Sequence, residues 1–265
     1  MNSVLGETFS ALAEDDAIEV FNPKGRFPGL LVCDHASAHV PRRYDGLGLP
    51  PETLNLHIGV DVGIAAVTRA LAAAIDAPAV LTRTSRLLID CNRWIADPTS
   101  IPQESDGITV PGNCNLNGEA RAERQERYFW PYHRMIHRML AQKHADHAAP
   151  IFLAMHSCTR QLGQERRDID AGTFWHSDAR LSSALISELS REPGLQVAEN
   201  LPYSGFVGTS FTLDYHTWGT GIPATGLEIV NDWVLTPPDQ ERWAERLAAA
   251  LRKIVDSLPM QARAR

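Results

Sequence analysis

LLVCDHASAHVP, residues 30–41, joins an unbroken apolar run to an acid, two histidines and a proline. Four consecutive apolar residues with polar neighbours are typical of a strand that is buried on both faces, as in a parallel sheet. Asp34 and His35 come directly after the last apolar residues, so their side chains should lie at the carboxyl edge of that sheet. Ligands of open α/β sheets bind at this edge. The stretch therefore predicts both a parallel sheet and a site at its edge.

The rest of the chain alternates between strand-like and helix-like segments. Short apolar runs typical of buried strands occupy 29–33, 79–82, 87–89, 151–155 and 224–230. Helical patterns occupy 62–75, 119–147, 179–191 and 236–257; Pro131 should kink or divide the second of them, and Thr236-Pro237 is a suitable N-cap with a proline in the first turn. This alternation predicts a three-layer α/β fold with helices on both faces of a mostly parallel sheet.

One irregular stretch interrupts this alternation. Residues 95–118 are too long for a routine connection between two elements, so we expect an active-site loop there, and whether it acts as a lid stays open. The sequence contains no internal repeat and no linker rich in serine and glycine. Residues 1–265 are therefore expected to form a single domain.

Composition narrows the classes of partner. The formal net charge is −7 and the isoelectric point is about 5.8, without a basic cluster, which argues against binding to nucleic acid. The N-terminus lacks a basic region, and the most apolar window, 62–81, contains Arg69 and Asp76, so neither a secretory signal nor a membrane span is expected. Four scattered cysteines without a CxxC pair fit a reducing compartment. We expect a cytoplasmic protein, and the sequence does not indicate its oligomeric state.

Histidines at strand ends are candidate metal ligands. His35 follows the first apolar run, His156 follows the run at 151–155, and Asp61 adds a carboxylate just before a helical segment. Two histidines and one carboxylate, with a position left for water, are the ligand set of many catalytic zinc sites. Each histidine could instead be a structural residue held by hydrogen bonds. His39 is a reserve ligand, because Pro41 argues against the helix that would place it beside His35.

Glu228 and the pair Asn92-Arg93 are the other polar residues in apolar surroundings. A glutamate within a buried strand must be paired, bound to a metal or functional, because an ionised group is rarely buried without compensation. Glu228 is therefore either the partner of an arginine or a general base. Asn92 and Arg93 should lie at the sheet edge, where they could bind a carboxylate, although Arg93 could also be an ordinary surface residue.

Seven short motifs, in this order along the chain, together resemble the N-formylglutamate amidohydrolase family, which is related to the zinc carboxypeptidase-like hydrolases. They are CDHAS (33–37), HIGVDVG (57–63), LIDCNRW (88–94), AMHSCT (154–159), NLPYSG (200–205), DYHTWG (214–219) and GLEIVND (226–232). Where the deformylases of histidine breakdown typically read Pro-His-Ser-Gly, this chain reads Asp34-His35-Ala36-Ser37. The chain thus resembles a divergent branch of the family.

The resemblance implies a phosphorylase/hydrolase-like fold with a mixed central sheet, one Zn²⁺ per chain and hydrolysis of an acidic N-acyl amino acid such as N-formylglutamate. Carried over position by position, it implies His35, Asp61 and His156 as metal ligands, Glu228 as general base, His216 as a second catalytic donor, and Asn92 with Arg93 as the substrate-binding pair. The implied partner is a small acidic molecule, and neither a nucleic acid nor a membrane.

Two other functions stay open from the residues alone. A cysteine hydrolase is possible because Cys158 and Cys33 each lie two residues from a candidate histidine ligand. A module that binds acidic metabolites without converting them would use Arg93 and the 95–118 loop, but it would not need Glu228 close to two histidines. Hydrolysis of a different N-acyl amino acid or of a peptide is a further alternative.

Overall fold

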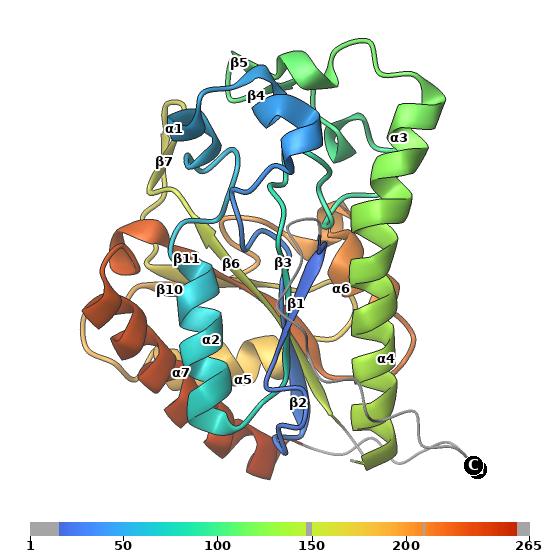
Figure 1. The fold of residues 1–265 in the computed structure, drawn as a ribbon. Helices are drawn as coiled ribbons and strands as arrows, with labels where there is room; N and C mark the ends of the chain where they lie inside the picture. The colour runs from blue at the N-terminus through green and yellow to red at the C-terminus, as the bar shows by residue number, and fades with distance from the viewer. Residues whose placement is uncertain (1–15, 147–149, 209, 259–265) are drawn as a thin grey trace, which may run out of the picture.

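A computed structural model describes residues 16–146, 150–208 and 210–258 of the chain (Figure 1). Its main sheet has seven strands in the spatial order β1-β3-β2-β6-β11-β9-β10. Their bounds are β1 Ile18–Phe21, β2 Gly29–Cys33, β3 Ala79–Thr82, β6 Ile151–Cys158, β9 Ala171–Phe174, β10 Val197–Glu199 and β11 Ala224–Val230. Strands β3, β2, β6 and β11 are parallel to one another, whereas β1 at one edge and β9 with β10 at the other run antiparallel to them. The sheet is therefore mixed and mostly parallel.

Helices cover both faces of this sheet, as Figure 1 shows. The helices are α1 Pro51–Leu54, α2 Ile64–Ile75, α3 Gly118–Arg124, a π-helical turn Gln125–Phe129, α4 Trp130–Asp146, α5 Arg180–Leu189, α6 Phe211–Thr217 and α7 Pro237–Ser257. One face contacts α2 and α5, on which α7 packs, and the other contacts α4 and α6. The fold is thus the predicted three-layer α/β arrangement. Within the described residues, no helix is long and apolar enough to cross a bilayer.

Each face of the sheet has its own apolar core. The alternation of side chains along β2 places Leu31 and Cys33 in the core under α2 and α7, and Leu30 and Val32 in the core under α4. The four parallel strands β3, β2, β6 and β11 are buried on both faces, which explains why their sequences are mostly apolar. A polar residue within such a strand has no solvent to face, so it must be hydrogen-bonded within the protein or point into a site.

Short 3-10 turns and two small hairpins fill the loops. The 3-10 turns are Arg42–Gly48, Pro98–Ser100, Pro111–Asn113, Gly205–Val207 and Asn231–Trp233, and the hairpins pair Glu104–Ser105 (β4) with Ile108–Thr109 (β5) and Gln161–Leu162 (β7) with Glu165–Arg166 (β8). Two of these 3-10 turns, and β4 with β5, lie within the 95–118 stretch, so the stretch is structured. Buried Arg124 donates to Asn113 Oδ1 at 2.6 Å and to the carbonyl of Gly112 at 2.9 Å, which anchors the end of the stretch.

Most predicted elements are present, with one clear error. The predicted strand at 87–89 is wrong: these residues are fully buried but form a turn, in which Leu88 N–H donates to the carbonyl of Ser85 at 3.0 Å. Three apolar residues are enough to fill a gap in a core, but burial alone does not require a strand. Strand β6 extends beyond the predicted 151–155 to Cys158, so that His156 lies within it.

The long helical stretch is interrupted where proline predicts an interruption. The π-helical turn Gln125–Phe129 ends directly before Trp130-Pro131. Proline has no N–H to continue the α-helical hydrogen bonds, and a change to wider turns accommodates this loss. At the last helix, Thr236 is the N-cap as predicted, and its side chain accepts from Asp239 N–H at 3.4 Å.

Candidate active site

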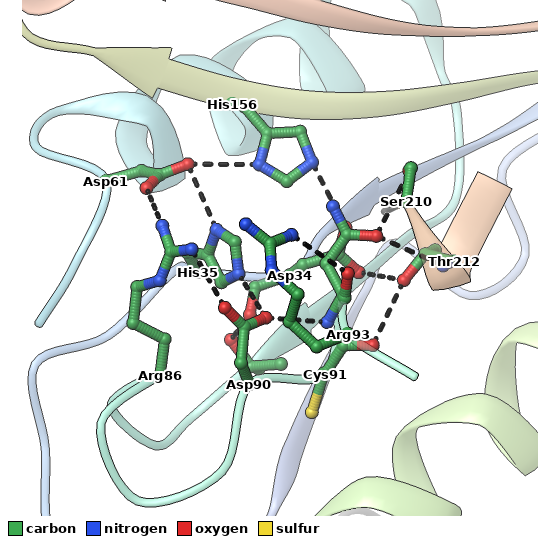
Figure 2. Close-up of polar contacts among 12 residues, drawn as sticks. Asp34, His35, Asp61, Arg86, Asp90, Cys91, Arg93, His156, Ser210 and Thr212 are labelled. Atoms are coloured by element: carbon green, nitrogen blue, oxygen red, sulfur yellow. Dashed lines mark hydrogen bonds and ion pairs between the residues drawn. The ribbon is translucent and has the colours of Figure 1, made fainter. Parts of the chain in front are cut away.

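Three buried side chains from distant parts of the sequence converge at the carboxyl edge of the parallel strands (Figure 2). His35 follows β2, His156 lies near the end of β6, and Asp61 precedes α2. Asp61 Oδ2 lies 3.3 Å from His35 Nδ1 and 3.0 Å from His156 Nδ1. The structure therefore brings together the three residues that the sequence suggested as metal ligands.

The segment that carries Asp61 is held closely against both strands. Asp61 N–H donates to the carbonyl of His35 at 3.0 Å, and Ser157 N–H donates to Asp61 Oδ2 at 3.3 Å. Gly63 follows with a φ of 80°, and a Cβ on it would come within 2.1 Å of the carbonyl oxygen of Val234. Only glycine fits this turn, which begins α2 and points Asp61 toward the histidines.

Each histidine has a second carboxylate on its other nitrogen. His35 Nε2 lies 2.7 Å from Asp90 Oδ1, and His156 Nε2 lies 3.1 Å from Asp34 Oδ2. Asp34 is itself held by Thr212, whose hydroxyl donates to Asp34 Oδ1 at 2.7 Å. A carboxylate on one imidazole nitrogen fixes the orientation of the ring and makes the opposite nitrogen a better ligand. Both rings are thus oriented with Nδ1 toward Asp61.

In this cluster, the attraction between carboxylates and imidazoles affects the pKa values more than burial does. Burial disfavours charge on all three residues, yet nearby Asp90 and Asp61 raise the pKa of His35, and Asp34 with Asp61 raises that of His156. In the same way, burial would raise the pKa of Asp61, but His35 and His156 hold it below its ordinary value. Asp61 is therefore ionised, and one of its oxygens is turned toward both imidazoles.

These donors fit a divalent cation. In a tetrahedral zinc site with ligand bonds of about 2.0–2.1 Å, neighbouring ligand atoms lie roughly 3.3 Å apart. The two distances from Asp61 Oδ2 are close to that value, and the three ligand atoms all lie within 4.8 Å of one another. One carboxylate and two imidazole nitrogens leave a coordination position open for water. His35, Asp61 and His156 could therefore hold a metal ion.

Glu228 is the buried acid without a partner. It is paired in register with His156 across the parallel strands β11 and β6, so the two side chains lie side by side. Its Oε2 atom is buried and makes no hydrogen bond to any residue that the structure describes. Burial raises the pKa of Glu228 to about 7, although the charge of His156 acts in the opposite direction. A carboxyl group with this pKa can both accept and release a proton near neutral pH.

Arg86 and Asp90 also belong to the cluster, and their roles were not predicted from the sequence. Arg86 Nη1 lies 3.3 Å from Asp61 Oδ1, and Arg86 Nη2 lies 2.8 Å from Asp90 Oδ2 (Figure 2). The turn at 87–89 brings these two side chains into contact, whereas an extended strand would place their Cα atoms about 13 Å apart. The signal in the sequence was an arginine and an aspartate four residues apart, on either side of a short apolar run.

Asn92 and Arg93 reach the same cavity. Asn92 is buried, and its Oδ1 atom accepts from Ser210 Oγ and from Thr212 N–H, both at 3.1 Å. Arg93 is half-buried and donates to the carbonyl of Asn92 at 3.2 Å. Both residues border the cavity that contains His35, His156 and Glu228, so the suggested substrate-binding pair lies beside the suggested metal site.

His216 is not brought to this cavity. It lies on α6, and its Nε2 atom is 3.1 Å from Nδ1 of His133 on α4. His133 Nε2 in turn donates to the carbonyl of Cys91 at 2.9 Å, so His133 Nδ1 must accept from His216. Both rings are buried between the helices and the sheet, and neither borders the cavity. The hydrogen bonds of His216 are those of a packing residue.

The reserve ligand and the cysteines also lie elsewhere. His39 is exposed on the loop after β2 and is not part of the buried ligand cluster. Cys33 is buried in the core under α2, and Cys158 is buried at the end of β6; neither borders the cavity. Burial raises the pKa of both thiols, which therefore remain protonated and poorly nucleophilic. Nothing in this arrangement favours a cysteine hydrolase.

The cavity is small and adjoins a larger hollow. It has a volume of about 110 Å³ and is bordered by His35, Asp61, Arg86, Asn92, Arg93, His156, Ser157, Phe174, Tyr203, Ser204, Ser210 and Glu228. Arg86 and Arg93 also border a neighbouring hollow of about 390 Å³, to which Thr99, Pro102, Glu104, Ser105 and Asp106 contribute. The 95–118 stretch thus lines the neighbouring hollow rather than the ligand cluster.

Comparisons with known proteins identify the family of the chain. The sequence model of the N-formylglutamate amidohydrolase family matches residues 27–235. A crystal structure of a gene product from Agrobacterium tumefaciens is 31% identical in sequence, with a TM-score of 0.88 over 92% of this chain and 96% of that chain. The N-formylglutamate amidohydrolase of Ralstonia eutropha JMP134 has the same fold, with a TM-score of 0.70 at 18% identity over 92% of this chain and 98% of that chain. No curated protein matches the chain.

Proposed function

Because the chain belongs to the N-formylglutamate amidohydrolase family, we propose that it is a zinc-dependent amidohydrolase that removes the formyl group from an acidic amino acid such as N-formylglutamate. The observation that carries this proposal is the position of Glu228. Its buried, unpartnered carboxyl lies beside His156, in the cavity that the three metal-ligating side chains share. A purely structural site gains nothing from an unsatisfied buried acid, whereas a hydrolase needs one.

His35 Nδ1, Asp61 Oδ2 and His156 Nδ1 would hold one zinc ion per chain. When bound there, the ion supplies a Lewis acid that makes water a nucleophile near neutral pH and polarises the acyl carbonyl. Asp90 and Asp34 keep the two imidazoles in the orientation that this binding requires. Arg86 holds the second oxygen of Asp61 and thereby keeps Oδ2 turned toward the histidines.

Glu228 would carry the proton during the reaction. It accepts a proton from the attacking water and later gives that proton to the nitrogen of the departing amino acid. A pKa of about 7 suits both steps, because neither the acid nor the carboxylate form is strongly favoured. Arg93 and Asn92 would bind a carboxylate of the substrate and hold the scissile amide in the cavity.

The size and charge of the site support a small acidic substrate. The cavity of about 110 Å³ leaves room for a small acyl group only, and Arg86 and Arg93 stand between it and the larger hollow. A chain that merely binds acidic metabolites would need these arginines but not Glu228. We therefore place hydrolysis ahead of simple binding, and formyl ahead of bulkier acyl groups.

The first experiment measures metal content and turnover on the same sample. Purified protein is analysed by plasma mass spectrometry, and hydrolysis of N-formyl-L-glutamate is followed before and after chelation. We expect about one zinc ion per chain, with turnover that chelation abolishes and zinc restores. Zinc with turnover of only bulkier N-acyl amino acids would move the substrate to that class. A protein that takes up no metal after reconstitution, or hydrolyses no N-acyl amino acid when loaded, would contradict the proposal.

A further inference from the structure

Tyr203 borders the catalytic cavity, and the proposed function assigns it no role. It lies in the segment Asn200–Gly205, which connects β10 to the 3-10 turn Gly205–Val207. The cavity it borders also contains Glu228, His156 and Arg93. Tyr203 is 45% exposed, which places it at the mouth of the cavity, where a substrate must pass.

The segment that carries Tyr203 is held rigidly on the neighbouring strand. Asn200 Oδ1 accepts from Trp175 N–H and from Gly205 N–H, both at 3.1 Å. Two glycines permit this close approach: a Cβ on Gly172 would come within 1.7 Å of the carbonyl oxygen of Leu201, and one on Gly205 within 2.2 Å of the carbonyl oxygen of Trp175. Tyr203 is thus positioned by the backbone before any ligand arrives.

Buried Arg167 fixes the hydroxyl of Tyr203. Its Nη2 donates to Tyr203 Oη at 2.8 Å, and its guanidinium carbon lies 4.9 Å from the centre of the Tyr203 ring. Arg167 is itself anchored, because Nη1 donates to the carbonyl of Thr159 at 2.9 Å and its backbone N–H donates to the carbonyl of Arg160 at 2.9 Å. The phenol is therefore oriented by a cation that cannot easily move.

The direction of this hydrogen bond decides what the phenol can do. A guanidinium group only donates, so Tyr203 Oη is the acceptor and its own proton stays available for another group. Burial raises the pKa of Tyr203, and the charge of Glu228 adds to this effect, so the phenol is neutral at physiological pH. Donation from Arg167 polarises the phenol and strengthens it as a donor. Tyr203 is thus a preorganised hydrogen-bond donor at the mouth of the cavity.

We propose that Tyr203 is a catalytic residue whose hydroxyl donates a hydrogen bond to the acyl oxygen of the substrate as that oxygen gains negative charge, and that Arg167 is the positioning residue for it. This inference rests on the proposed amide hydrolysis. As water adds to the acyl carbon, the electron pair of the carbonyl π bond moves to the acyl oxygen. Tyr203 keeps its proton throughout, so its contribution is electrostatic and strongest in the transition state.

Substitution of Tyr203→Phe removes the hydroxyl and leaves the ring. Loss of one such donor typically lowers kcat by about 10²-fold or more. We expect that loss of kcat for N-formyl-L-glutamate, with KM within about twofold of the wild-type value. Tyr215→Phe is the matched control, because Tyr215 is exposed, stacks on Phe211 and does not border the cavity. It should keep wild-type kcat.

Two further measurements separate catalysis from structure. Calorimetric binding of N-formyl-L-glutamate to metal-free protein should give the same Kd, within about twofold, for wild type and Tyr203→Phe, because the hydroxyl acts mainly on the transition state. Arg167→Met should lower kcat by about tenfold, and Arg167→Lys should recover part of that loss by restoring a donor to the hydroxyl.

The outcomes distinguish this inference from the function on which it rests. Wild-type turnover that Tyr203→Phe leaves unchanged would overturn the role of Tyr203 alone. A loss expressed in KM and in the Kd of the metal-free protein, with kcat preserved, would make Tyr203 a binding residue and also overturn it. Unchanged kcat in Arg167→Met would remove the positioning role. Absence of wild-type turnover with every N-acyl amino acid would instead remove the proposed hydrolysis and this inference with it.

Discussion

The position of Glu228 depends on the register in which strand β11 pairs with strand β6. The strand β11 is buried along its whole length, and Glu228 is its one ionisable residue. Pairing of β11 with β6 places this acid opposite His156, at the end of the sheet where the three proposed metal ligands gather. A shift of the register by one residue would turn Glu228 into the core under α2 and α7. The reactivity of the acid thus depends on strand pairing as much as on its own chemistry.

Replacement of Glu228 by glutamine tests the role of the carboxyl as a base. The amide keeps the size of the side chain but cannot accept the proton, so kcat should fall by about 10²–10⁴-fold. Zinc content measured by plasma mass spectrometry should stay near one ion per chain, because the three ligands are unchanged. Glu165→Gln, at an exposed position of β8, is the control and should keep full activity. A Glu228→Gln protein with nearly normal kcat would exclude Glu228 as the base.

At the scale of single residues, the sequence predicts which residues belong to the site better than it predicts which side chains contact one another. His35, His156 and Glu228 could be identified because each interrupts or ends a buried apolar run. Arg86 and Asp90 could not, because their roles depend on a turn that reverses the chain between them. His216 lies in a matching motif, yet a neighbouring helix supplies His133 as its partner, and no local pattern contains that information.

At the scale of elements, the active site depends on how closely the Asn200–Gly205 segment lies on β9. Gly172 allows the carbonyl of Leu201 to occupy the space of a side chain. Neither β9, with the sequence AGTF, nor β10, with the sequence VAE, was predicted, because neither is a continuous apolar run. The parallel strands β2, β3, β6 and β11 can be predicted from their apolar sequences alone. The strands at the edge of the sheet depend on contacts with neighbouring loops, which the sequence of the strand does not show.

Gly172→Ala tests this close contact. The added methyl group would lie 1.7 Å from a backbone oxygen, so the Asn200–Gly205 segment must move. We expect the free energy of unfolding, measured in urea, to fall by about 1–3 kcal/mol, and kcat to fall because Tyr203 is displaced. Gly118→Ala is the control: a Cβ there meets no atom within 4 Å, and the residue lies at the start of helix α3. Equal stability of the two variants would show that the segment is free to move.

At the scale of the whole molecule, a buried histidine pair joins the helical layer to the sheet. His133 on α4 and His216 on α6 share a hydrogen bond, and His133 also donates to the carbonyl of Cys91. A second proton on His133 would go to Nδ1 and place two donors against each other. A second proton on His216 would leave its hydrogen bond to His133 intact and is opposed by burial. Burial lowers the pKa of His133 to about 4 and, together with the charge of His133, that of His216 to about 3.

These two pKa values predict a loss of stability in mild acid. An imidazole of the unfolded chain takes up a proton near pH 6.5, so between that pH and about 4 the unfolded chain binds more protons than the folded one. The pair therefore makes its full contribution to the free energy of unfolding above about pH 6.5, and this contribution declines as the pH falls toward the pKa values of the folded protein. Between pH 7 and pH 5 the expected cost is about 2 kcal/mol for each histidine, since one pKa unit corresponds to about 1.4 kcal/mol.

His216→Gln separates this effect from the titration of the active-site acids. Glutamine can still donate to His133 Nδ1 but takes up no proton, so the variant should lose about 1–2 kcal/mol less free energy of unfolding than the wild type between pH 7 and pH 5. Urea unfolding at the two pH values gives the difference, and the contributions of Asp34, Asp61 and Asp90 cancel because both proteins contain them. If wild type and variant lose the same free energy, the acid sensitivity of the fold does not lie in the contact between α4 and α6. A smaller loss in the variant would instead show that this contact, which no motif in the sequence reveals, contributes to the acid sensitivity of the folded protein.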